Sequence, residues 1–105
     1  MDEMTVQELS NRIKNGTAPK IIDVREPFEY DLAHIEGAIL KPLPQLMRWA
    51  KELDKDQEYV MQCHTGSRSA YAMMVLTQLG FKKVYNLSGG IDEWSARIDP
   101  KVPRY

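Results

Sequence analysis

Short apolar runs alternate along the chain with segments in which apolar residues recur at helical spacing. Val6, Leu9 and Ile13 are three and four positions apart, which places them on one face of a helix. Thr5 precedes this segment and Glu8 follows three residues later, which is the pattern of a capping box. The pattern therefore predicts a helix that begins at Val6.

The rest of the chain follows the same alternation. Strands are expected at residues 21–24, 38–40, 59–62 and 84–87, and further helices at 28–35, 43–53, 67–79 and 91–98. Strands that alternate with helices predict an α/β fold, in which a parallel sheet has helices on both faces. Ligands of such folds bind beyond the carboxyl ends of the strands. Cys63 directly follows the third expected strand and therefore lies at such an end.

The composition limits the kinds of protein that this chain can be. Its 105 residues predict a single domain over 1–105, and 43% hydrophobic with 28% charged residues is typical of a folded, soluble protein. The net charge of -1, without a basic run, gives no indication of a nucleic-acid partner. The apolar stretches are too short to cross a membrane, and the start lacks the pattern of a signal peptide. We therefore expect a cytoplasmic protein without a membrane partner.

Cys63 is the only cysteine, so an internal disulfide is impossible. A cysteine-based zinc site would have to be completed by the two histidines and carboxylates, and no metal site is predicted. A lone cysteine is often a small buried hydrophobic residue. The residues around Cys63 therefore decide whether it has a chemical role.

The segment after Cys63 favours a reactive sulfur. Gly66 and the small residues beside it allow the backbone to curl, so that successive amides point inward and form a nest for an anion. The start of the expected helix adds about half a positive charge, and Arg68 adds a full one nearby. Such a field favours the thiolate of Cys63, which is the nucleophilic form.

Three motifs in this chain resemble the signatures of the rhodanese family. They are Ile21 to Ala38, with the sequence IIDVREPFEY near its start; Val60 to Ala70, around Cys63; and Asn86 to Trp94, with the sequence NLSGGIDEW. The resemblance implies the rhodanese-like fold, with a central parallel sheet of about five strands. It also implies that Cys63 is catalytic and carries a persulfide. The implied persulfide-binding loop consists of His64, Thr65, Gly66, Ser67 and Arg68.

The length of this loop separates two chemistries. Phosphatases of related fold have five residues between the cysteine and the arginine, whereas four residues separate Cys63 from Arg68. The shorter loop is the rhodanese form, so we expect sulfur transfer rather than phosphate hydrolysis. A second alternative is a non-catalytic interaction module, against which the intact cysteine loop argues. His64 is either a spacer in the loop or an acid or base, and the sequence leaves both open.

The resemblance also implies a mechanism and partners. Sulfur is expected to pass from thiosulfate or a persulfide donor protein to Cys63, and then to cyanide, a thiol or a sulfur-carrier protein, without a cofactor. Asp23 and Arg25 resemble a structural pair of the family, and Arg25 is also a candidate for steering anions. The tail at residues 98–105 is similar to the end of rhodanese modules fused to adenylating enzymes that activate sulfur carriers. It could equally pack against the sheet edge or act as a structural clasp.

Overall fold

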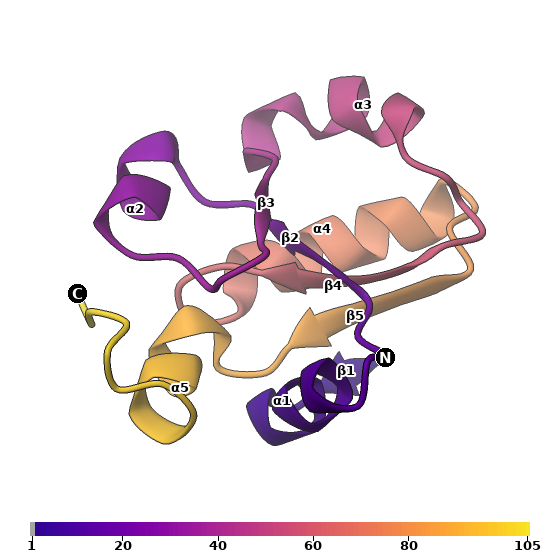
Figure 1. The fold of residues 1–105 in the computed structure, drawn as a ribbon. Coiled ribbons are helices and arrows are strands. Elements are labelled where there is room, and N and C mark those ends of the chain that lie inside the picture. Colours follow the sequence, from indigo (N-terminus) through magenta and orange to yellow (C-terminus); the bar gives the residue numbers. More distant parts are fainter. Residues whose placement is uncertain (1) are drawn as a thin grey trace.

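The computed structural model describes residues 2–105 (Figure 1). It contains a five-stranded sheet with the order β1-β5-β4-β2-β3, in which every pair of neighbouring strands is parallel. The strands are β1 (Glu3–Met4), β2 (Lys20–Asp23), β3 (Ile39–Leu40), β4 (Glu58–Gln62) and β5 (Lys83–Leu87). The α-helices are α1 (Val6–Lys14), α2 (Pro27–Leu32), α3 (Leu46–Trp49), α4 (Ser67–Gln78) and α5 (Gly90–Arg97). The expected α/β fold with a parallel sheet is therefore confirmed.

Strand β1 is the element that the apolar pattern did not locate. It is two residues long, and it pairs with β5 through Glu3 opposite Asn86 and Met4 opposite Leu87. The amide of Ser88 also donates to the carbonyl of Met4 at 2.9 Å. A strand of two residues is too short to show an alternation of apolar and polar residues in the sequence. It is recognised only by its pairing with β5 in the structure.

The helix expected over 43–53 is wrong as a single element. The segment consists of a 3₁₀ turn at Leu43–Gln45, the one-turn helix α3, and a second 3₁₀ turn at Ala50–Glu52. Pro44 lies within the first turn, where it has no amide to donate and its ring fixes the backbone. Short 3₁₀ turns of this kind are common at helix ends.

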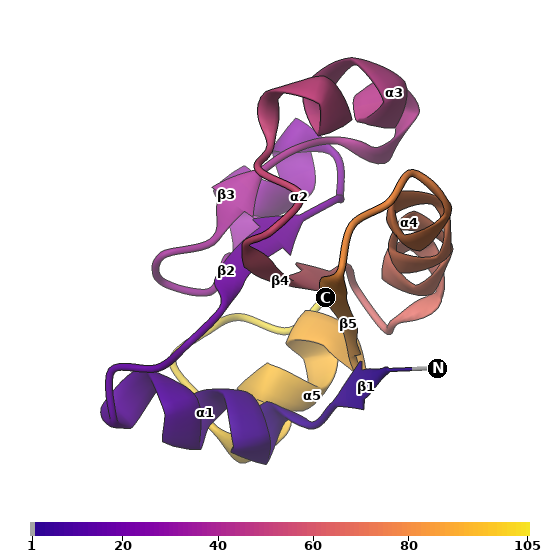
Figure 2. The same cartoon turned by 90° about the vertical axis from the view of Figure 1, so that its right-hand side faces the viewer.

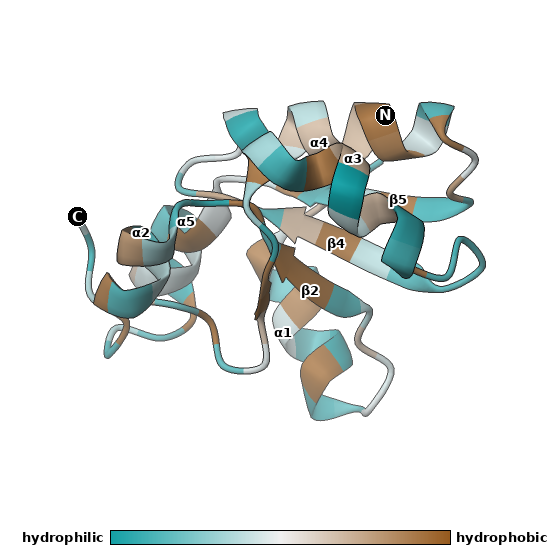
Figure 3. Ribbon diagram, turned by 90° about the horizontal axis from the view of Figure 1, so that it is seen from above, coloured by the Kyte–Doolittle hydropathy of each residue, from teal (hydrophilic) through white to brown (hydrophobic). Residues whose placement is uncertain are grey.

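Two hydrophobic layers enclose the sheet. Helices α3 and α4 cover one face, and α1 and α5 cover the other (Figure 2). Successive side chains of β4 point to opposite faces of the sheet. Met61 therefore packs with the residues under α4, and Val60 packs with those under α1 and α5. Figure 3 shows the resulting hydrophobic colour along β2 and on parts of β4. Burial on both faces explains why these strands read as continuous apolar runs.

Helices α1 and α2 begin with a capping box. The capping box of α1 is present, since the amide of Glu8 donates to the hydroxyl of Thr5 at 3.0 Å and the Glu8 carboxylate accepts from Thr5. In the described part of the chain, no helix has the length and apolar character needed to cross a bilayer.

Candidate active site

Cys63 directly follows β4, the middle strand of the sheet. Only 1% of the residue is exposed, and it packs among the core residues between the sheet and α4. Its sulfur nevertheless has polar partners. The amide of Gly66 donates to Sγ at 3.1 Å, and the hydroxyl of Ser69 lies 3.3 Å from Sγ. The sulfur is thus buried and hydrogen-bonded at the same time, rather than surrounded only by apolar side chains.

The carbonyls of the loop are held by the start of α5. The amide of Ile91 donates to the carbonyl of Cys63 at 2.9 Å, and the amide of Asp92 donates to that of His64 at 3.1 Å. Four loop amides have no acceptor within residues 2–105, namely those of His64, Thr65, Ser67 and Arg68. With two loop carbonyls bound to α5, these four amides keep unused donors, while the amide of Gly66 donates to the sulfur. The anion nest that the sequence predicts would need such donors.

Gly90 makes this contact between α5 and the loop possible. Its φ angle is +60°, and a Cβ atom there would lie 2.5 Å from the carbonyl oxygen of His64 and 2.6 Å from that of Cys63. A glycine is therefore required both by conformation and by space. The sequence analysis placed Gly90 only within the motif from Asn86 to Trp94.

A second set of polar contacts connects the cysteine loop to Asn86 of β5. The hydroxyl of Ser69 is 2.5 Å from the Asn86 amide oxygen, and the Asn86 amide nitrogen donates at 3.2 Å to the carbonyl of Gly66. The same nitrogen contacts the carboxylate of Glu3 at 3.2 Å. Because Asn86 is only 5% exposed, these contacts fix the back of the loop in a water-poor setting. Sequence reasoning assigned no role to Ser69, Asn86 or Glu3.

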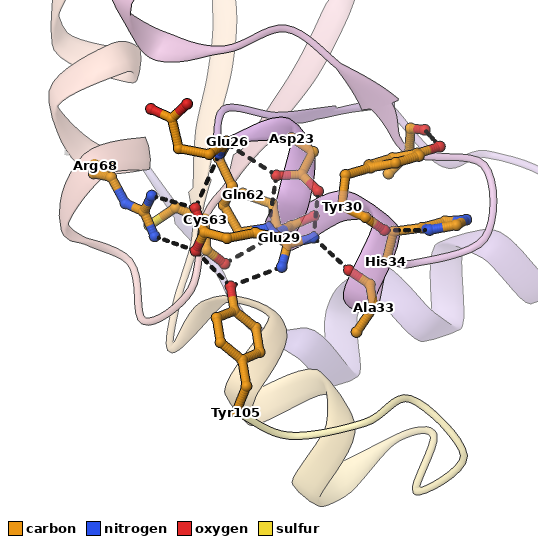
Figure 4. Close-up of polar contacts among 12 residues, drawn as sticks. Asp23, Glu26, Glu29, Tyr30, Ala33, His34, Gln62, Cys63, Arg68 and Tyr105 are labelled. Atoms are coloured by element: carbon orange, nitrogen blue, oxygen red, sulfur yellow. Dashed lines mark hydrogen bonds and ion pairs between the residues drawn. The ribbon is translucent and has the colours of Figure 1, made fainter.

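Arg68 is paired with a carboxylate that the sequence did not single out. Its two terminal nitrogens donate to the two oxygens of Glu29, at 2.8 and 3.0 Å (Figure 4). Glu29 lies in α2, where the amide of Glu26 also donates to it at 2.9 Å. The hydrogen bonds from Arg68, against the effect of burial, lower the pKa of Glu29 to about 2. The positive charge expected at the start of α4 is therefore present, but a fixed anion neutralises it.

The C-terminal segment reaches the same place. The hydroxyl of Tyr105 accepts from Arg25 at 2.8 Å and donates to Glu29 at 2.7 Å (Figure 4). The Tyr105 ring stacks on the ring of His64, with centroids 4.0 Å apart and planes 8° from parallel. Arg104 pairs with Asp92 at 3.0 Å. Of the interpretations left open for the tail, these contacts fit a clasp, and they fasten it over the cysteine loop.

Arg25 lies in the interior and is paired with Asp23, as expected for a structural role. The residue is fully buried, and its guanidinium contacts Asp23 at 2.6 and 2.9 Å and the carbonyl of Ala33 at 2.7 Å. Since no part of the side chain reaches the surface, Arg25 cannot touch an approaching anion. Steering by Arg25 would have to act through its electric field, which the buried Asp23 carboxylate largely offsets.

The fold and the site together define an α/β domain with a cysteine at the end of the middle strand, whose sulfur accepts from an amide of the loop that leads into α4. Residues 5–97 match the Rhodanese-like domain family. The chain therefore belongs to the rhodanese-like family.

Several known proteins are similar to this chain. A protein named "Sulfurtransferase" from Allochromatium vinosum is 32% identical over 102 residues, which are 97% of this chain and 95% of that protein. The probable adenylyltransferase/sulfurtransferase MoeZ of Mycobacterium tuberculosis is 36% identical over 104 residues, which are 97% of this chain. The crystal structure of a rhodanese-related protein from Thermoplasma volcanium has a TM-score of 0.86 and 33% identity, and each chain is covered completely.

Some of the curated relatives are much longer than this chain. The matched region is 26% of MoeZ and 52% of the putative sulfur carrier protein YrkF of Bacillus subtilis. The similarity therefore concerns one domain of these proteins.

Proposed function

We propose that this domain is a sulfurtransferase that carries sulfane sulfur as a persulfide on Cys63. The observation that carries the proposal is the setting of the sulfur. Sγ accepts from the amide of Gly66 and lies beside the Ser69 hydroxyl, while neighbouring loop amides have no acceptor within residues 2–105. These amides can stabilise the negative charge of a thiolate or of the outer sulfur of a persulfide.

The first step loads the sulfur. The Cys63 thiolate attacks the outer sulfur of thiosulfate, the S–S bond of the donor breaks, and sulfite leaves with the electron pair. With a persulfide donor RSSH, the same attack releases the thiolate RS⁻ and leaves the proton on the new Cys63 persulfide. The loop amides of His64, Thr65, Gly66, Ser67 and Arg68 hold the persulfide in either case.

The second step unloads it. An acceptor nucleophile attacks the outer sulfur, and the Cys63 thiolate is restored as the bond within the persulfide breaks. Cyanide accepts this sulfur as thiocyanate, and a thiol or an activated sulfur-carrier protein is the proposed cellular acceptor. The name of the relative YrkF, a putative sulfur carrier protein, supports a sulfur-carrier acceptor, and that of MoeZ supports sulfur transfer. The proposed location is the cytoplasm, where a free thiol stays reduced.

The loop length favours this reaction over phosphate hydrolysis. Four residues separate Cys63 from Arg68. In addition, both terminal nitrogens of Arg68 donate to Glu29, so the two are not available together for a phosphate. The intact cysteine and its amide donors favour a catalytic domain over an interaction module.

Mass spectrometry tests the proposal directly. After incubation with thiosulfate or glutathione persulfide, the protein should gain about 32 Da, which cyanide should remove. The variant Cys63→Ser should gain nothing. If the wild-type protein takes up no sulfur from either donor but releases phosphate from an aryl phosphate, the domain is a phosphatase. If it does neither, the interaction module is the better description.

A further inference from the structure

The positive charge of Arg68, beside the cysteine loop, is paired with a carboxylate, which disfavours a donor that would need this charge. Both terminal nitrogens of Arg68 are engaged by the two oxygens of Glu29, whose side chain is 6% exposed. Glu29 also accepts from Tyr105 at 2.7 Å. The charge of Arg68 is therefore neutralised by Glu29, whose carboxylate accepts hydrogen bonds from Arg68, from Tyr105 and from the amide of Glu26.

This arrangement affects possible sulfur donors differently. Thiosulfate is a dianion whose sulfonate oxygens match the paired nitrogens of a guanidinium. To bind Arg68 in that way it must displace Glu29, and otherwise it lies close to the negative charge of Glu29. A persulfide donor has no sulfonate group. It needs only the loop amides around Cys63, which Glu29 leaves free.

The C-terminal segment reinforces this difference. Tyr105 donates to Oε2 of Glu29, the oxygen that also accepts from Arg68 (Figure 4). The ring of Tyr105 stacks on that of His64. Its hydroxyl also connects Glu29 to the buried Arg25. Glu29 therefore has two hydrogen bonds, from Tyr105 and from the amide of Glu26, that do not depend on Arg68, whose side chain is 37% exposed.

We propose that Glu29 and Tyr105 are specificity-determining residues that make this site take sulfur from thiol persulfides in preference to thiosulfate. This inference rests on the proposed sulfur transfer. The favoured step is the attack of the Cys63 thiolate on the outer sulfur of RSSH, in which the donor S–S bond breaks and RS⁻ leaves with the electron pair. Neither residue takes part in the bond changes.

The test compares kcat/KM for glutathione persulfide and thiosulfate in the wild-type protein and in Glu29→Gln. Glutamine removes the charge and keeps an oxygen that can accept from the amide of Glu26. We expect kcat/KM for thiosulfate to rise about tenfold, because a unit charge near a dianion is removed. The value for glutathione persulfide should stay within about twofold. The matched control is Asp31→Asn, which removes an exposed carboxylate from the same helix and should change neither value.

Tyr105→Phe provides a second, milder perturbation. It removes the hydroxyl and keeps the ring that stacks on His64. The loss of one hydrogen bond to Glu29 should raise kcat/KM for thiosulfate about threefold. This variant decides the question if Glu29→Gln does not fold.

The outcomes separate the two proposals. A wild-type protein that takes sulfur from both donors, with a ratio that neither Glu29→Gln nor Tyr105→Phe changes, overturns the inference and leaves sulfur transfer standing. An equal change in Asp31→Asn also overturns it, because the effect would then come from net charge alone. A wild-type protein that takes sulfur from no donor removes the proposed function, and the inference with it.

Discussion

Replacing Gly90 with alanine tests the contact between the start of α5 and the cysteine loop. The Cβ of alanine would lie 2.5 Å from the carbonyl oxygen of His64 and 2.6 Å from that of Cys63. These are backbone atoms, so the clash cannot be relieved by turning a side chain. The start of α5 must move away from the loop, and its amide hydrogen bonds to the two carbonyls are lost.

The cost of this change has two parts. Alanine at a positive φ angle costs roughly 1 kcal/mol, and the loss of two hydrogen bonds adds about 1 kcal/mol for each. The free energy of unfolding should therefore fall by about 3 kcal/mol in Gly90→Ala. Gly16→Ala is the matched control, because Gly16 has φ +78° and no heavy atom within 4 Å of the added Cβ. This control should lose only the roughly 1 kcal/mol of backbone strain.

Urea denaturation of both variants measures the difference, and thermal unfolding should show midpoints lower by about 12 °C and about 4 °C. Gly90→Ala should also take up sulfur from glutathione persulfide more slowly, since the loop carbonyls are no longer held. If the two variants are equally stable and load sulfur at the same rate as the wild-type protein, the contact between α5 and the loop does not organise the site.

Two further predictions concern buried charges. Arg25→Met leaves the fully buried Asp23 carboxylate without its partner and should cost about 3–5 kcal/mol in urea denaturation, whereas the double change Asp23→Leu with Arg25→Met should recover most of that loss. The second prediction follows from the pKa of Glu29, which is lowered to about 2 by Arg68. Between the unfolded value near 4.5 and about 2, the unfolded chain binds more protons than the folded one, so this contribution to stability is complete above pH 4.5 and is lost as the pH falls toward 2. Glu29→Gln should flatten this part of the curve of unfolding free energy against pH, and an unchanged slope would contradict the assignment.

The order and type of most elements could be predicted because each has a strong local pattern. The capping box at Thr5 marks the start of α1, and the apolar runs of β2 and β4 are typical of strands buried on both faces. Prediction failed where tertiary contacts decide the structure. Strand β1 exists because Met4 completes the sheet edge beside β5, and the segment around Pro44 folds into separate short turns.

In the site, the residues close to Cys63 along the chain could be predicted from the sequence. Residues that are distant along the chain and contact the loop only after folding could not. Cys63 and Gly66 are three residues apart, so their contact follows from local loop geometry. Glu29 and Tyr105 are 39 and 37 residues from Arg68 along the chain. Nothing in the local pattern around either one indicates that it lies near Arg68. Only the packing of α2 and the course of the tail bring them to the loop.

The docking of Gly90 against the two loop carbonyls also limits the order in which the parts of the site can assemble. A ribosome-bound chain that ends before α5 has the cysteine, the glycine and the arginine, but nothing to restrain the carbonyls of Cys63 and His64. The loop around Cys63 therefore reaches its final form only after α5 has folded against it.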